Sequence, residues 1–80
     1  MNTVPYSEIE TATEHDIGKI ALLPLGCAPL AIENTLDECR LAAEQCTGET
    51  IERDDIDDFT DHYYLATGDL VAVEIGICSN

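Results

Sequence analysis

The sequence predicts a small α+β fold, in which one helix packs on a small antiparallel sheet. Three observations favour this fold class. The 80 residues suffice for one hydrophobic core but leave no room for a second, so we expect residues 1–80 to form a single domain. Apolar residues recur with helical spacing between residues 34 and 47. Two β-prone runs near the C-terminus flank a glycine, as the strands of a β-hairpin do.

The N-terminal segment shows little periodicity. Ser7 is placed to cap a short helix that would carry Ile9 and Ala12. Residues 19–23 form an apolar run before Pro24, which is compatible with a buried strand or with the end of a helix. We expect a strand here, joined to the C-terminal hairpin in a sheet of about three strands.

The main helix is expected over residues 34–47. Asn34 is a suitable N-cap, and Gly48 stands where a helix-terminating glycine belongs. Leu41 falls on the side of the helix opposite to its apolar stripe. The stripe itself consists of Leu36, Cys39, Ala43 and Cys46.

The C-terminal hairpin is expected to pair residues 63–66 with residues 70–75 around Thr67-Gly68-Asp69. In the second strand, Ala72 and Glu74 alternate with Val71, Val73 and Ile75, which suggests one buried and one solvated face. We expect a short helix over 54–60 before this hairpin. A longer helix is the alternative, because four apolar residues also recur with helical spacing: Ile56, Phe59, Tyr63 and Ala66.

The charge of the chain restricts its partners. Seventeen acidic and three basic residues give a net charge of −14, whereas a small domain usually carries a magnitude of about 2–8. DNA, RNA and anionic membranes would repel such a chain. A hydrophobic fraction of 45% is too high for a disordered acidic tail.

The longest uncharged stretch, residues 20–32, is shorter than the roughly 20 apolar residues that a membrane-spanning helix needs. The N-terminal residues 1–6 lack the lysine or arginine of a signal peptide, so we expect a cytoplasmic protein.

No motif indicates catalysis or metal binding. The four cysteines form no C-x-x-C pair, and we expect them to be buried thiols rather than zinc ligands. An EF-hand loop starting at Asp55 would place Phe59 at its fifth position, where a ligand is needed. The chain lacks a nucleophile elbow and a glycine-rich phosphate loop, and nothing near Cys27 would lower its pKa. We therefore expect no enzymatic activity, no cofactor and no metal site.

Acidic residues are concentrated in residues 49–61, which hold seven acids and one base. A general role in solubility or in adaptation to high salt explains such a concentration poorly, because clustered like charges destabilise a fold. A basic protein groove built for phosphates would bind clustered carboxylates in place of DNA, which carries one charge per about 1.7 Å of helix axis. The candidate partner-binding residues are Glu49, Glu52, Asp54, Asp55, Asp57, Asp58 and Asp61.

In size, charge and lack of motifs, the chain resembles the anti-CRISPR proteins and other DNA-mimicking inhibitors encoded by phages. The likeness is one of composition over the whole chain. It rests on the seven acids of residues 49–61, assisted by Glu8, Glu10, Glu14 and Asp16. It implies an inhibitor that occupies the DNA-binding or guide-RNA-binding surface of a CRISPR–Cas or other nucleic-acid-handling complex. Both DNA mimicry and another blocking mode are compatible with it.

Two other functions are compatible with the same residues. One is an antitoxin-like or regulatory protein that neutralises a basic toxin or nuclease, and the other is a structural phage protein with incidental acidity. The protein is expected to be a monomer or a homodimer. Leu41 and an unpaired strand at residues 70–77 are the features that would support a homodimer.

Overall fold

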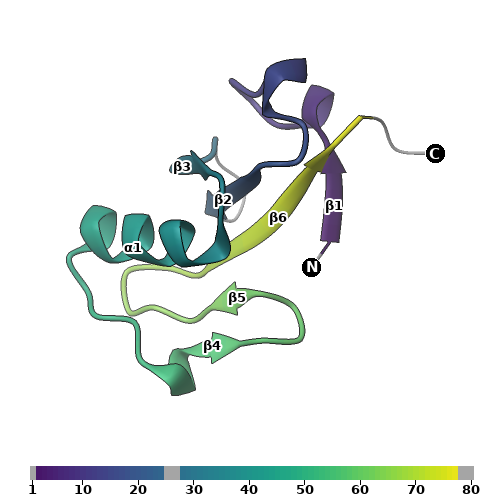
Figure 1. Ribbon diagram of the computed structural model, residues 1–80. Helices are drawn as coiled ribbons and strands as arrows, with labels where there is room; N and C mark the ends of the chain where they lie inside the picture. Colours follow the sequence, from purple (N-terminus) through teal and green to yellow (C-terminus); the bar gives the residue numbers. More distant parts are fainter. Residues whose placement is uncertain (1, 25–27, 78–80) are drawn as a thin grey trace.

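The computed structural model describes residues 2–24 and 28–77, and within these ranges one α-helix packs on a six-stranded sheet (Figure 1). The expected α+β class is therefore confirmed. The helix, α1, spans Leu36–Thr47. The strands are β1 (Asn2–Pro5), β2 (Ile20–Pro24), β3 (Ala31–Glu33), β4 (Ile56–Asp57), β5 (His62–Tyr63) and β6 (Leu70–Gly76).

The last strand, β6, organises the sheet. β2 runs antiparallel along one edge of it, from Ile20 opposite Glu74 to Pro24 opposite Leu70. The other edge is shared by β5, which pairs antiparallel with residues 70–71, and β1, which pairs parallel with residues 73–76. β3 extends the sheet beyond β2, and β4 extends it beyond β5. The expectation of an unpaired strand at residues 70–77 is wrong, because β6 has partners on both edges.

Both faces of the sheet are buried. Leu22, Leu70 and Ala72 meet Cys39 and Ala43 of α1 on one face. On the other face, Ala21, Val73 and Ile75 are covered by Ile9 and its neighbours. The expected solvated face is thus wrong, and the helix lies on the Leu70 and Ala72 side rather than on the Val71, Val73 and Ile75 side. Strands that are buried on both faces are apolar at successive positions.

The helix starts at Leu36, and its N-cap lies one residue later than expected. Thr35, rather than Asn34, is its N-cap, and the Thr35 hydroxyl accepts a hydrogen bond from the Glu38 backbone N–H at 3.2 Å. Gly48 ends the helix with a φ of 74°, a left-handed conformation that costs a side-chain-bearing residue about 1–2 kcal/mol. Cys39 and Ala43 are buried as expected, whereas Cys46 is exposed.

The N-terminal segment differs from its prediction. The expected helix at Ser7 is only the 3-10 turn Tyr6–Glu8, which has Pro5 as its N-cap. It is preceded by β1, a strand that exists only through its pairing with β6. Ile9 follows the turn and is buried against the sheet. The strand predicted over 19–23 is confirmed as β2.

The expected helix over 54–60, and the longer alternative, are both wrong. A 3-10 turn, Arg53–Asp55, leads directly into a hairpin in which Ile56 pairs with Tyr63. A helix would stack the aspartates of this segment at spacings of three and four residues, where like charges repel. The predicted C-terminal hairpin is present, but its first strand is His62–Tyr63, and residues 64–69 form the connection.

None of the helices in the described ranges has the length and apolarity needed to cross a membrane. Cys27 and Cys78, which were expected to be buried thiols, lie outside the described residues.

Candidate functional site

The acidic segment, residues 49–61, follows α1 and forms the 3-10 turn Arg53–Asp55 and the β4–β5 hairpin, at the lower end of the molecule in Figure 1. The carboxylates therefore lie neither on one helix face nor along one extended strand. They fall into two groups. Some hold the backbone of this end in place, and others project into solvent.

Glu49 holds a loop. Its carboxylate accepts hydrogen bonds from the backbone N–H groups of Ala66 and Thr67, both at 3.1 Å, and from the Thr67 hydroxyl at 2.6 Å. The Thr67 hydroxyl is the main cause of a lowered pKa of the Glu49 carboxyl, because these hydrogen bonds stabilise its charged form. Glu49 thus ties the β5–β6 connection to the segment after α1 and has little freedom to face a partner.

Three aspartates shape the turn and the hairpin. Asp55 accepts a hydrogen bond from the Glu52 N–H at 3.0 Å, which closes the 3-10 turn. Asp57 accepts one from the Phe59 N–H at 3.0 Å, as an aspartate at the start of a turn commonly does. Asp61 is only 8% exposed, has a φ of 53°, and its carbonyl accepts from the Ala72 N–H at 3.0 Å. Asp61 is therefore part of the frame rather than of the surface.

The other three predicted residues, Glu52, Asp54 and Asp58, are exposed. Arg53 is exposed beside them, but among the residues described here the ion pair formed by a lysine or arginine is Lys19–Asp16, at 3.5 Å. Within residues 2–24 and 28–77, no lysine or arginine forms an ion pair with Glu52, Asp54 or Asp58. The structure brings these carboxylates to one end of the fold on a hydrogen-bonded frame.

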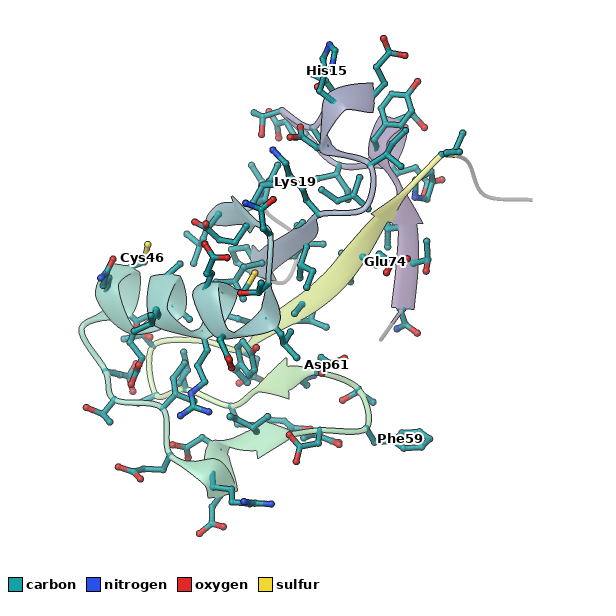
Figure 2. The ribbon with its side chains drawn as sticks, viewed as in Figure 1. His15, Lys19, Cys46, Phe59, Asp61 and Glu74 are labelled. Carbon is teal, nitrogen blue, oxygen red and sulfur yellow. The ribbon has the colours of Figure 1, made fainter. Side chains whose placement is uncertain are left out.

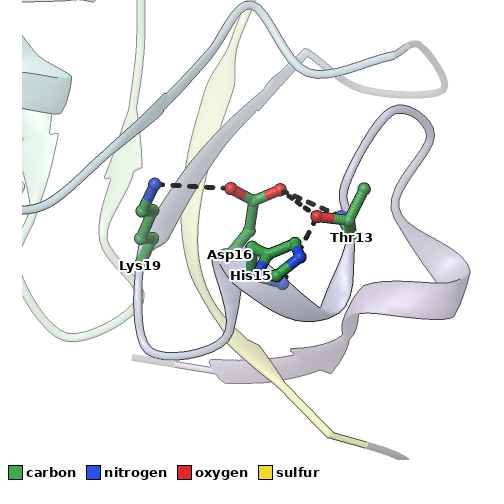
Figure 3. Close-up of polar contacts among 4 residues, drawn as sticks. All are labelled: Thr13, His15, Asp16 and Lys19. Atoms are coloured by element: carbon green, nitrogen blue, oxygen red, sulfur yellow. Dashed lines mark hydrogen bonds and ion pairs between the residues drawn. The ribbon is translucent and has the colours of Figure 1, made fainter.

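The N-terminal acids lie at the opposite end of the view in Figures 1 and 2. Glu8, Glu10 and Glu14 are exposed. Asp16 is engaged, because its carboxylate accepts from the Thr13 N–H at 2.9 Å and also faces Lys19 (Figure 3). The hydrogen bond from the Thr13 backbone is the main cause of a lowered pKa at Asp16. The two acidic groups therefore lie at opposite ends of this view (Figure 2).

A feature that sequence reasoning missed is the exposure of Phe59. Its side chain is 91% exposed at the turn between β4 and β5, and Figure 2 shows it pointing away from the fold. The signal was present, because Phe59 lies among Asp57, Asp58 and Asp61. The helical spacing of Phe59 with Ile56 and Tyr63 predicts a helix instead, whereas Phe59 lies at the tip of a hairpin.

A second missed feature is a small cluster formed by His62 of β5, Tyr64 and Asp69. The His62 and Tyr64 rings stack with centroids 4.4 Å apart. The buried Nε2 of His62 lies 3.3 Å from a carboxylate oxygen of Asp69 but makes no hydrogen bond. No local sequence pattern predicts the contact between His62 and Asp69, because it depends on the pairing of β5 with β6.

An open groove of about 560 Å³ lies between the end of α1, the turn at residues 67–70, Pro24 and Leu30. Its lining is mainly apolar and includes Cys46 and Asp69. None of the seven predicted binding residues lines it, so it is separate from the acidic end. Within residues 2–24 and 28–77, no three His, Cys, Asp or Glu side chains gather in a way that would hold a metal ion.

Comparison with known proteins finds no family model, no curated protein and no solved structure that matches this chain.

Proposed function

We propose that this protein binds a nucleic-acid-binding surface of another protein, rich in lysine and arginine, and blocks it in the cytoplasm. Clustered carboxylates occupy the place of phosphates, as expected of the DNA-mimicking inhibitors, anti-CRISPR proteins among them, that the chain resembles. One observation carries the proposal. Glu52, Asp54 and Asp58 are exposed at one end of the fold, and two carboxylates of the same segment, Asp55 and Asp57, hold its backbone by hydrogen bonds.

Electrostatics explains why such an end favours this kind of partner. Uncompensated like charges destabilise the isolated fold, and a basic surface relieves that repulsion. A groove that binds phosphates holds condensed or bound anions, and their release favours binding as it does for DNA. Long-range attraction also accelerates the encounter. Because the backbone that carries the carboxylates is already held by hydrogen bonds, little backbone ordering is required on binding.

The test compares two variants that carry the same net charge. The first changes Glu52→Gln, Asp54→Asn and Asp58→Asn at the hairpin end. The second changes Glu8→Gln, Glu10→Gln and Glu14→Gln at the opposite end. Each removes three negative charges, so the net charge becomes −14 + 3 = −11 in both. All six side chains are exposed, so both variants should fold.

Each immobilised protein is incubated with a nuclease-treated bacterial lysate, and bound proteins are eluted with a duplex DNA oligonucleotide. We expect the wild type and the N-terminal variant to retain a protein that duplex DNA displaces, and the hairpin-end variant to lose it. The purified partner should then bind DNA less well when the wild-type chain is added. Equal retention by both variants, or the absence of any DNA-displaced protein, would refute the proposal. A partner that proves to be a basic toxin would support the antitoxin alternative.

A further inference from the structure

The most exposed large apolar side chain in the described part of the chain is Phe59, at the tip of the acidic hairpin (Figure 2). The other exposed large apolar side chains are between 38% and 68% exposed, whereas Phe59 is 91% exposed. Single exposed leucines or isoleucines are ordinary on protein surfaces. A nearly fully exposed phenylalanine contributes little to its own fold, while burying it elsewhere yields roughly 1.5–3 kcal/mol.

The tip that carries Phe59 is ordered by hydrogen bonds on both sides of the ring. On the N-terminal side of Phe59, Asp57 accepts two hydrogen bonds. Its side chain accepts from the Phe59 N–H, and its carbonyl accepts from the Thr60 N–H at 3.2 Å. On the C-terminal side of Phe59, Asp61 is buried, and its carbonyl accepts a hydrogen bond from the Ala72 N–H of β6. The ring is thus carried by a turn whose backbone is held by hydrogen bonds, so little backbone ordering is required on binding.

The residues around the ring indicate what covers it. Asp58 precedes it and is exposed, and the Asp57 carboxylate lies in the same turn, where it accepts from the Phe59 N–H. An apolar surface rimmed by acids would repel this tip, and so would a second copy of the chain, which also carries a charge of −14. An apolar pocket rimmed by lysine or arginine complements both the ring and the carboxylates. Cationic side chains also interact favourably with the face of an aromatic ring.

We propose that Phe59 is the apolar anchor of the binding surface, inserted into a pocket of the partner protein that is apolar at its base and lined with Lys or Arg at its rim. This inference rests on the proposed function and adds to it the contact that gives the complex its specificity. The carboxylates attract a basic surface in general, whereas the ring selects one that contains a pocket. Buried aromatic anchors of this kind dominate the affinity of many interfaces.

Phe59 is the only phenylalanine in the sequence, so 4-fluorophenylalanine labels this position alone. A single ¹⁹F resonance should show the solvent-isotope shift of an exposed ring in the free protein. On addition of the purified DNA-displaced partner, we expect that shift to be lost. Poly-L-lysine serves as a control that supplies positive charge without a pocket, and should leave the shift in place. Loss of the shift on raising the concentration of the chain alone would mean that a second copy covers the ring, and would overturn the inference.

Affinity measurements separate this inference from the proposed function. Phe59→Ala should weaken partner binding about 30-fold or more while leaving its dependence on salt unchanged. Phe59→Leu should retain part of the affinity, and Leu41→Ala, at an exposed apolar residue of α1, should retain all of it. If Phe59→Ala binds like the wild type while the hairpin-end charge variant does not, the anchor is wrong and the proposed function stands. If no DNA-displaced partner exists, both are refuted.

Discussion

The second core, on the sheet face away from α1, depends on Ile9, and replacing this residue should reveal how much the N-terminal segment stabilises the fold. Ile9 is 5% exposed and packs with Ala21, Val73 and Ile75. Ile9→Ala removes three carbon atoms, which corresponds to about 2.4 kcal/mol at roughly 0.8 kcal/mol for each buried methylene. The cavity left behind raises the expected loss to about 3 kcal/mol, within the usual range for such changes.

This loss is large for a domain of this size. At about 0.05–0.15 kcal/mol per residue, 80 residues give a free energy of unfolding of roughly 4–12 kcal/mol. A change of about 3 kcal/mol should lower Tm by about 12–24 °C, since each kcal/mol corresponds to about 4–8 °C in small domains. Thermal unfolding followed by circular dichroism measures this directly.

The matched control is Ile77→Ala, which makes the same chemical change at a side chain that is 68% exposed. With only a third of the side chain buried, we expect a loss of about 0.8 kcal/mol. Equal decreases in Tm for the two variants would show that Ile9 is not buried against the sheet, and that the second core does not form as described.

Three further predictions concern local contacts. Burial raises the pKa of the Cys39 thiol to about 11, which disfavours its reactive thiolate form, whereas Cys46 is exposed. In a Cys27→Ser, Cys78→Ser variant, Cys46 should therefore react quickly with a thiol reagent and Cys39 slowly. Equal rates for the two thiols would contradict this prediction. Because the pKa of Glu49 is lowered from 4.5, the stability that its charge contributes should be present above pH 4.5 and lost as pH falls through the folded-state pKa. The Tm difference between the wild type and Glu49→Gln should therefore shrink on acidification. An unchanged difference would argue against the contact. Gly48→Ala should lower the free energy of unfolding, measured in urea, by about 1 kcal/mol, because Gly48 has a φ of 74°. No atom lies within 4 Å of the added methyl group, so no steric clash adds to this loss. A loss above about 3 kcal/mol would point to another cause.

The sequence predicted those elements whose signals are local. The helix was found because an apolar stripe and a terminating glycine lie within one short segment, and β2 was found because Ile20, Ala21 and Leu22 are apolar in succession. β1, β3 and β4 were missed. Each has only two to four residues, too few for an alternating pattern, and β1 also depends on pairing with the distant β6.

The candidate site shows the same limit. Composition located the acidic end, but it could not separate exposed carboxylates from those that support the backbone. Glu49 is bound to Thr67 and Asp61 is buried next to β6, and both contacts depend on the β5–β6 connection. The helical spacing of apolar residues in this segment suggested a helix, and it did not take account of the four aspartates of residues 54–58. The cost of stacking like charges favours a turn and a hairpin instead.

The position of β6 at the centre of the sheet has a consequence for synthesis of the protein on the ribosome. Until residues 70–76 have been made, the described sheet consists of two separate hairpins, β2–β3 and β4–β5, and an unpaired β1. The sheet can therefore assemble only after β6 has been translated. Pairing of β1 with β6 joins residues that are far apart in the sequence, and such pairing is slow because a long loop must close before the contacts form. A nascent chain stalled before residue 70 would expose the apolar surfaces of both hairpins to chaperones and proteases.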